Sequence, residues 1–321
     1  MISLNFCNLL FLKVSQGENL VNVKKHARLA LALEKRKSIF FPVPILTEKF
    51  STSLIEAKPE GVHALDDKQF DVDYLGKIES GFHITYLNNY RSQLAFWFDD
   101  YGLAIGSAKQ VQKQITLIPK FSFYIDHLVQ YGLLLTSQLK TPDGPSHEDL
   151  VYCLEKLKTL AELYPPNFEH KYLLLQAEQG RYQNKGIEQL APLYEAAIVS
   201  AGENGFLQYE ALANELYGTF WVTKNLPKTG LGHLKNALQL YNQWGCTVKT
   251  GHITERYRTL LVESNFEYST THTFDSSLPT TLERTTLANT QTNTQESLDL
   301  SSVMKSAQAI SGELALKSLV A

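Results

Sequence analysis

The stretch that decides the fold runs from Gly205 to Trp244 and reads GFLQYEALANELYGTFWVTKNLPKTGLGHLKNALQLYNQW. Its apolar residues recur at helical spacings, which predicts two amphipathic helices, Gly205–Thr223 and Pro227–Trp244. The turn between them, Asn225-Leu226-Pro227, is short. Because a short turn forces two helices to run antiparallel, this stretch predicts an αα-hairpin.

Small residues in this hairpin follow the spacing of tetratricopeptide-type (TPR) repeats, in which paired helices approach closely at small side chains. Gly218 is followed by Gly230, Leu234 and Ala237, and Trp221 takes the large aromatic position. Weaker versions of the pattern lie upstream: Ala177 with Leu193 and Ala196, and Ala95 with Ser107, Val111 and the aromatic Phe98. The step from Ala177 to Gly218 exceeds the consensus period of ~34 residues. We therefore expect degenerate TPR-like hairpins with lengthened helices; the alternative is an ordinary helical bundle with chance small residues.

Helical periodicity is nearly continuous over residues 78–262, and we expect this range to form a TPR-like helical repeat domain. One-sided apolar patterns run from Phe82 to Phe98, from Leu103 to Ile115 and from Pro119 to Leu135. Thr141–Pro145 is a break, after which Ser146 caps the next helix. The later helices are expected at Glu148–Leu163, Asn167–Tyr182, Gly186–Ala201 and Val248–Leu261. The fold class is therefore all-α, a TPR-like αα-hairpin solenoid.

Residues 1–77 predict an irregular helical start to this array. The apolar run Met1–Val14 lacks the charged flank and cleavage site of a secretory signal, and it is shorter than the ~20 residues that span a bilayer. We expect it to form a core-facing helix. A second helix is expected at Asn19–Lys37, whereas Phe40–Pro44 and Ala57–Asp73 are expected to be connections.

The composition changes after residue 262. Residues 263–297 are rich in Thr, Ser, Asn and Gln with few apolar side chains, which predicts a disordered, flexible linker. Residues 298–321 predict a C-terminal amphipathic helix whose stripe comprises Leu300, Val303, Met304, Ala307, Ile310, Leu314 and Leu319. An isolated helix of this length is marginal in water, so we expect it to need a partner.

Charge and cysteine content narrow the class of protein. Lys and Arg number 30 against 33 Asp and Glu, a formal net charge of −3, which argues against nucleic acid as the main partner. Cys7, Cys153 and Cys246 are too far apart in sequence to suggest a disulfide framework or a zinc site. These features favour a reducing, cytoplasmic setting without a membrane partner.

No motif in the sequence predicts a catalytic, cofactor-binding or metal-ligating residue. Phosphate-cradling Gly-Lys-Ser/Thr, protein-kinase and zinc-ligand signatures are all missing. Ser146-His147-Glu148 resembles a phosphoacceptor start, but a helix cap explains Ser146 better. Ser137–Lys140 and Lys228-Thr229-Gly230 resemble serine β-lactamase motifs, yet the latter opens a helix rather than a strand. The remaining groups are expected to be core or surface residues: His26, His83, His127, His170, His233, His252 and the aromatic runs 96–98, 121–124 and 220–221.

Several strings resemble one family of large multidomain signalling proteins. They are Tyr209–Trp221 (YEALANELYGTFW), Ala237–Lys249 (ALQLYNQWGCTVK), Ile118–Tyr124 (IPKFSFY), Phe70–Tyr74 (FDVDY) and Leu298–Glu313 (LDLSSVMKSAQAISGE). In that family a serine/threonine-kinase-like domain and an AAA-type ATPase precede a long TPR-like region, followed by a GAF sensor and a histidine kinase. The resemblance implies that this chain is the C-terminal part of the helical region, ending just before the GAF domain.

The resemblance implies a non-catalytic interaction and coupling module in a sensor kinase. Its partners would be the ATPase and sensor modules, with a possible homodimer through residues 298–321. Two alternatives stay open. One is a stand-alone enzyme with Glu178, Glu215 or His233 on a concave face of the solenoid. The other is a fragment of a TPR-type transcriptional regulator, although the acidic balance argues against direct DNA contact.

Overall fold

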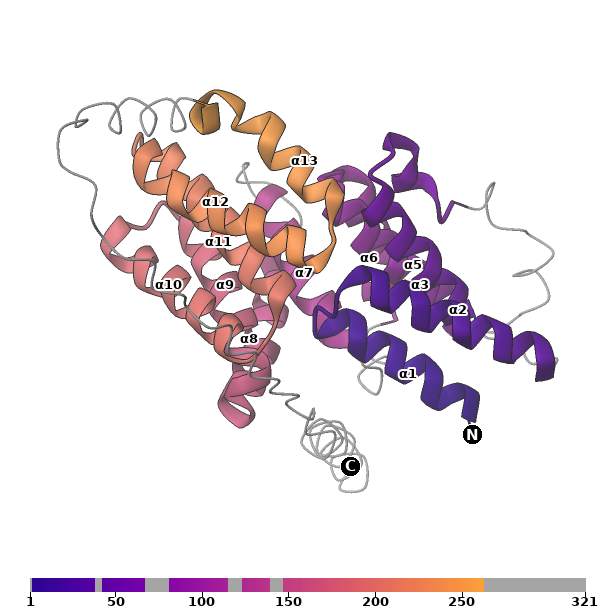
Figure 1. Ribbon diagram of the computed structural model, residues 1–321. Coiled ribbons are helices and arrows are strands. Elements are labelled where there is room, and N and C mark those ends of the chain that lie inside the picture. Colours follow the sequence, from indigo (N-terminus) through magenta and orange to yellow (C-terminus); the bar gives the residue numbers. More distant parts are fainter. Residues whose placement is uncertain (1, 38–41, 67–80, 115–122, 139–146, 263–321) are drawn as a thin grey trace, which may run out of the picture. The chain divides into compact units, whose positions relative to one another are not determined.

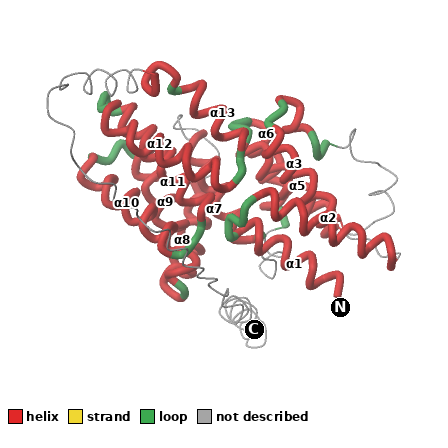
Figure 2. The backbone as a smooth tube through the Cα atoms, viewed as in Figure 1, coloured by secondary structure: helices red, strands yellow, loops and turns green. Residues whose placement is uncertain are grey.

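The computed structural model describes residues 2–37, 42–66, 81–114, 123–138 and 147–262 (Figure 1). Across these ranges every regular element is helical and short loops join the helices (Figure 2). The all-α prediction is therefore confirmed for the described part of the chain. Contacts divide the chain into Met1–Arg256 and Tyr257–Ala321, and all helices named below belong to the first unit.

Twelve α-helices and one 3₁₀ turn are assigned in the described ranges. The first group contains α1 (Ile2–Ser15), α2 (Leu20–Lys37), α3 (Pro42–Glu56) and the 3₁₀ turn η1 (Pro59–His63). The second contains α5 (Gly81–Trp97), α6 (Tyr101–Gln112), α7 (Tyr124–Gln138) and α8 (His147–Leu163). The third contains α9 (Pro165–Tyr182), α10 (Ile187–Glu203), α11 (Leu207–Thr223), α12 (Pro227–Trp244) and α13 (Thr247–Arg256).

Prolines begin helices at two places where the sequence analysis expected otherwise. Pro42–Pro44 was expected to be a connection, but these residues form the first turn of α3. The helix expected to start at Asn167 begins instead at Pro165. Only Tyr164 separates it from α8. Proline suits the first turn of a helix because its missing N–H would have no intrahelical partner there. Both expected boundaries were therefore wrong for the same physical reason.

Successive helices pack mainly on their neighbours in sequence. Contacts join α7 to α8 and α9, α9 to α10 and α11, and α11 to α12, and these helices lie side by side in Figure 1. Left-handed residues end several of the helices and turn the chain, among them Asn184 (φ 56), Asn225 (φ 59) and Gly245 (φ 86). Asn and Gly tolerate this conformation best, so the residue types at these positions favour the turns.

The hairpin of α11 and α12 is built on a contact between two backbones. A Cβ added to Gly230 would lie 2.5 Å from the carbonyl oxygen of Gly218, and one added to Gly218 would lie 2.8 Å from Cγ of Leu234. Leu234 and Ala237 are fully buried. The small residues that the sequence analysis singled out are thus the ones at which these two helices meet.

The hairpin of α9 and α10 uses different residues from those expected. Ala177 is buried, but Leu193 is half-buried and Ala196 is exposed. The buried side of α10 carries Leu190, Tyr194, Ala197 and Ala201. The close approach is at Gly180, where an added Cβ would lie 2.5 Å from Cδ2 of Leu190. The spacing of α11 and α12 does not transfer to this hairpin because its small residue sits later in the first helix.

The first two helices pack against the last part of the array. Gln208 of α11 donates through Nε2 to the carbonyl oxygen of Ser15 at 2.6 Å. Asn19 caps α2 by accepting from the N–H of Val21 at 3.0 Å and donates to the carbonyl oxygen of Gln243 at 2.7 Å. Contacts also join α13 to α3. Helices therefore pack not only on their neighbours in sequence: the segment 15–19 also contacts α11 and α12.

Within the described ranges, no helix combines the length and apolar character needed to cross a bilayer. The expected core-facing helix near the amino terminus is α1, which buries Cys7, Leu10, Phe11 and Val14. The linker 263–297, the helix 298–321, the cap at Ser146 and the strings 70–74 and 118–122 lie outside the described residues.

The glycine contact predicts opposite effects for two neighbouring substitutions in α12. Gly230→Ala should lower the free energy of unfolding by about 2 kcal/mol, because the new methyl group meets backbone that cannot move aside. Gly232→Ala, where an added Cβ meets nothing within 4 Å, should be neutral or should stabilise by up to about 1 kcal/mol through helix propensity. Urea unfolding of both variants measures the difference. Equal effects of the two substitutions would contradict the close approach.

Candidate functional site

Helix α11 carries polar side chains into the interior of the first unit. Gln208, Tyr209, Asn214 and Glu215 are all buried, together with the apolar residues around the same helix. A buried polar group costs free energy unless it is hydrogen-bonded, and a buried charge costs more unless it is paired. The partners of these α11 residues therefore define the sites at which chemistry or conformational control could occur.

The first site is an ion cluster around Glu215, which is only 3% exposed. Lys249 of α13 donates from Nζ to Glu215 Oε1 at 2.7 Å and to Asp99 Oδ1 at 2.9 Å. Tyr241 of α12 donates its hydroxyl to Glu215 Oε2 at 2.7 Å. One carboxylate thus joins α11, α12 and α13, and Lys249 extends the cluster to the turn between α5 and α6.

Asp99 collects three basic side chains of a single helix. Its Oδ2 accepts from Arg256 Nη2 at 2.8 Å and lies 3.2 Å from His252 Nδ1, while its Oδ1 accepts from Lys249. Positions 249, 252 and 256 lie on one face of α13, at helical spacing. Asp99 itself lies in the turn after α5 and has a positive φ of 59. We call Asp99, Glu215, Lys249, His252 and Arg256 the α13 clamp.

Charges in the clamp shift the pKa values of its members. Burial alone would lower the pKa of Lys249, but the carboxylates of Glu215 and Asp99 outweigh it and raise that pKa. Burial alone would raise the pKa of Asp99, but the hydrogen bond from His252 and the charge of Lys249 hold it below its usual range. Both groups therefore stay charged at neutral pH, and each stabilises the other.

The second site surrounds Lys171 of α9, which is 1% exposed. Its Nζ lies 3.6 Å from Asp126 Oδ1 and 4.7 Å from the ring centroids of Phe206 and Tyr209. Tyr209 donates its hydroxyl to Asp126 Oδ1 at 2.8 Å. Burial lowers the pKa of Lys171 because the single, more distant carboxylate of Asp126 offsets it only in part. This site ties α7, α9 and α11 together.

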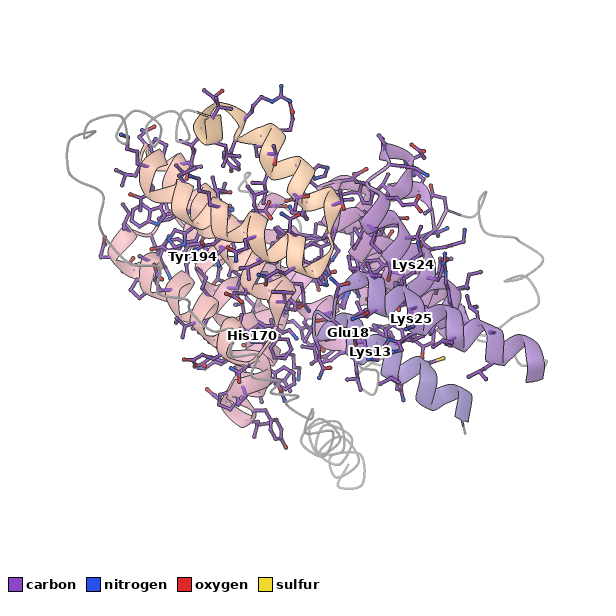
Figure 3. The ribbon with its side chains drawn as sticks, in the orientation of Figure 1. Lys13, Glu18, Lys24, Lys25, His170 and Tyr194 are labelled. Carbon is purple, nitrogen blue, oxygen red and sulfur yellow. The ribbon has the colours of Figure 1, made fainter. Side chains whose placement is uncertain are left out.

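His170 adjoins this second site and is buried without a hydrogen-bond partner at either ring nitrogen (Figure 3). Its ring lies 4.3 Å from that of Phe206 and 5.4 Å from that of Tyr209. Burial, with the charge of Lys171, holds its pKa well below the usual range, so the imidazole is neutral. His170 is thus a core residue, one of the two kinds expected for the histidines, and aromatic rings surround it.

Glu178, Glu215 and His233, the residues named for a possible stand-alone enzyme, each contact different partners. Glu178 accepts from the hydroxyl of Tyr194 at 2.5 Å and pairs with Arg181 (Figure 3 labels Tyr194). Glu215 belongs to the α13 clamp, and His233 lies 3.2 Å from Asn214 Oδ1 on the α11–α12 hairpin. The structure therefore does not assemble these three side chains into one constellation of nucleophile, base and orienting group.

The other groups weighed from the sequence are mostly packed. The aromatic residues Phe96, Trp97, Phe123, Tyr124 and Phe220 are buried, as expected for core positions. Cys7, Cys153 and Cys246 are buried. Lys228-Thr229-Gly230 opens α12, so its likeness to a serine-enzyme motif has no strand to support it. Among the described residues, no group of His, Cys, Asp and Glu is placed to hold a metal ion.

The most exposed apolar side chains of the N-terminal helices lie on α2. Val21 is 58% exposed and Leu29 53%, and Leu33 is also exposed. Lys25 and Arg28 share this side of the helix, and Figure 3 labels Lys25 on it. We call these five residues the α2 face. A surface of basic and apolar side chains suits a partner with acidic and apolar groups.

Sequence reasoning missed Asp99, Asp126, Lys171 and Lys249. Asp99 and Asp126 follow apolar runs, Phe96-Trp97-Phe98-Asp99 and Tyr124-Ile125-Asp126, whereas Lys171 and Lys249 lie in mostly polar stretches. A charge on the apolar side of a helix predicts a buried partner, and that signal was available for the two aspartates. The identity of the partner was not, because Asp99 and Lys249 are 150 positions apart.

Comparison of the chain with known protein families, with curated proteins and with solved structures found no match.

A buried histidine predicts how stability depends on pH. His127 is 2% exposed, lies 3.1 Å through Nε2 from Gln112 Oε1 and stacks on Tyr131. Burial lowers its pKa to about 3. Between that value and the ordinary histidine pKa of ~6.5 the unfolded chain binds a proton that the folded chain does not. Stability is therefore lost as pH falls, by about 2 kcal/mol between pH 7 and pH 5.

The measurement is urea unfolding of His127→Phe and of the parent chain at pH 7 and pH 5. Between pH 7 and pH 5, the free energy of unfolding of the variant should fall by about 2 kcal/mol less than that of the parent. His63→Gln, which changes an exposed histidine paired with Asp66, serves as the control. A variant with the same pH dependence as the parent would contradict the neutral, buried state of His127.

Proposed function

We propose that this chain is a non-catalytic helical-repeat module that binds and couples other modules of a multidomain sensor kinase. The proposed partners are an AAA-type ATPase module on one side and a GAF sensor with a histidine kinase on the other. The setting is cytoplasmic signal transduction, and residues 298–321 are the proposed contact for a homodimer. The proposal includes that the chain is the part of such a kinase that precedes its sensor.

The observation that carries the proposal is the Gly218–Gly230 contact between α11 and α12. A hairpin closed by small residues at these positions is typical of TPR-like units, which stack on one another and bind other proteins rather than perform chemistry. The separation of Glu178, Glu215 and His233 into different partner sets supports the same interpretation. The resemblance of 209–221 and 237–249 to the helical region of hybrid kinases supplies the identity of the partners.

The α2 face is the surface that we assign to partner binding. Its exposed apolar residues would be poorly placed in water, and its lysine and arginine are complementary to acidic side chains. The opposite side of α2 is already used, because Val23, Ala27 and Ala30 are buried. A partner can therefore contact Val21, Lys25, Leu29 and Leu33 from the solvent side, whereas Arg28 already pairs with Glu48 of α3 at 3.0 Å.

The test is a pull-down with the 321-residue chain as bait and, separately, the ATPase part and the GAF–histidine kinase part of a family member as prey. At least one should be retained. Val21→Asp combined with Leu29→Asp should weaken retention about tenfold, because a buried charge opposes docking. Val199→Asp, at a residue 52% exposed on α10, is the matched control and should bind as the parent does. Retention of neither part would remove the proposal.

A further inference from the structure

The α13 clamp supplies the charged contacts that attach α13 to the rest of the first unit. Helix α13 has 10 residues, and its buried side chains are Val248, Lys249 and Ile253. A helix of this length is marginal in water when it stands alone. Two apolar side chains and the ion pairs to Asp99 and Glu215 attach it to the rest of the first unit, together with its contacts to α12 and α3.

The clamp acts on one side of α13 only, from elements that are themselves firmly packed. Asp99 follows α5, in which Leu94, Ala95, Phe96 and Trp97 are buried. Glu215 lies mid-way along α11, enclosed by its neighbours. The socket made by these two carboxylates and Tyr241 is thus fixed, whereas α13 enters it through the left-handed Gly245 (φ 86) and Cys246. Glycine at this point permits the left-handed turn that ends α12 and starts α13.

We propose that Asp99 is a latch for α13: the helix docks and undocks as one unit at the clamp, while α1 to α12 stay folded. The proposal rests on the proposed function, which it deepens, because α13 connects the array to residues 257–321. Docked and undocked α13 are then the two states that a coupling module needs. Local opening of a short helix with few apolar contacts is the kind of motion that costs less than global unfolding.

The chain carries its own probe of this motion. Cys246 immediately precedes α13 and is fully buried, and its N–H donates to the carbonyl oxygen of Tyr241 at 2.9 Å. Burial raises the pKa of its thiol to about 12, so the docked state reacts slowly with alkylating reagents. Cys7 in α1 and Cys153 in α8 are also buried and report on the remainder of the first unit.

The experiment compares iodoacetamide labelling of the three thiols in the full chain and in Asp99→Asn, resolved by peptide mass spectrometry at one pH. Asparagine keeps the size of the side chain and tolerates the positive φ, so the substitution removes charge rather than backbone conformation. Labelling of Cys246 should accelerate about tenfold, because Lys249 and Arg256 lose a charged hydrogen-bond partner. Labelling of Cys7 and Cys153 should stay within a factor of about two, as expected for opening confined to α13.

Two further variants make the outcome decisive. Glu178→Gln removes a buried carboxylate from α9 and should leave the Cys246 rate unchanged. Arg256→Gln, at a side chain 46% exposed, weakens the clamp more gently and should accelerate Cys246 alone, including in the event that Asp99→Asn does not fold. An unchanged Cys246 rate, or equal acceleration of all three thiols, overturns the latch. Labelling uses the chain without partners, so this failure is distinct from an absence of retention in the pull-down.

Discussion

The enclosure of α11 is the constraint on which the rest of the structure depends. A helix that is buried around most of its circumference can carry a carboxylate only if cations and hydroxyl groups reach it. Glu215 meets that requirement with Lys249 and Tyr241, and Lys249 in turn requires Asp99. The packing of α13 beside the turn after α5 therefore provides the partners that this buried charge requires.

The protein contains two kinds of buried polar site, which differ in the number of charged partners. In the α13 clamp, two carboxylates face two permanent cations and the charges reinforce one another. At Lys171 a single carboxylate lies farther away, and aromatic rings provide much of the environment. The clamp sits at the edge of the unit beside a short helix, whereas Lys171 is held between long ones. The two sites use similar residue types but differ in their position in the fold.

Hairpin formation and hairpin detail were predictable to different degrees. Apolar periodicity and turn residues located α8 to α12 to within two residues, and the glycines of α11 and α12 were identified as the point of contact. The register of α9 on α10 was not, because Gly180 rather than Ala177 allows the approach of Leu190. Two helix starts were also misplaced, since Pro42 and Pro165 read as breaks in sequence but serve as first-turn residues. A proline in the sequence indicates where one helix ends more clearly than where the next helix begins.

The sequence by itself determined that this protein is helical, where most of its helices lie and that one pair meets at glycine. These features depend on residues close together in the chain, whose periodicity and conformational preferences act locally. Only the tertiary structure decided that the first helices pack on α11 and α12, and that Asp99 is the partner of Lys249. Such pairings join residues far apart in sequence, and their strength comes from burial, which exists only once the surrounding helices have packed.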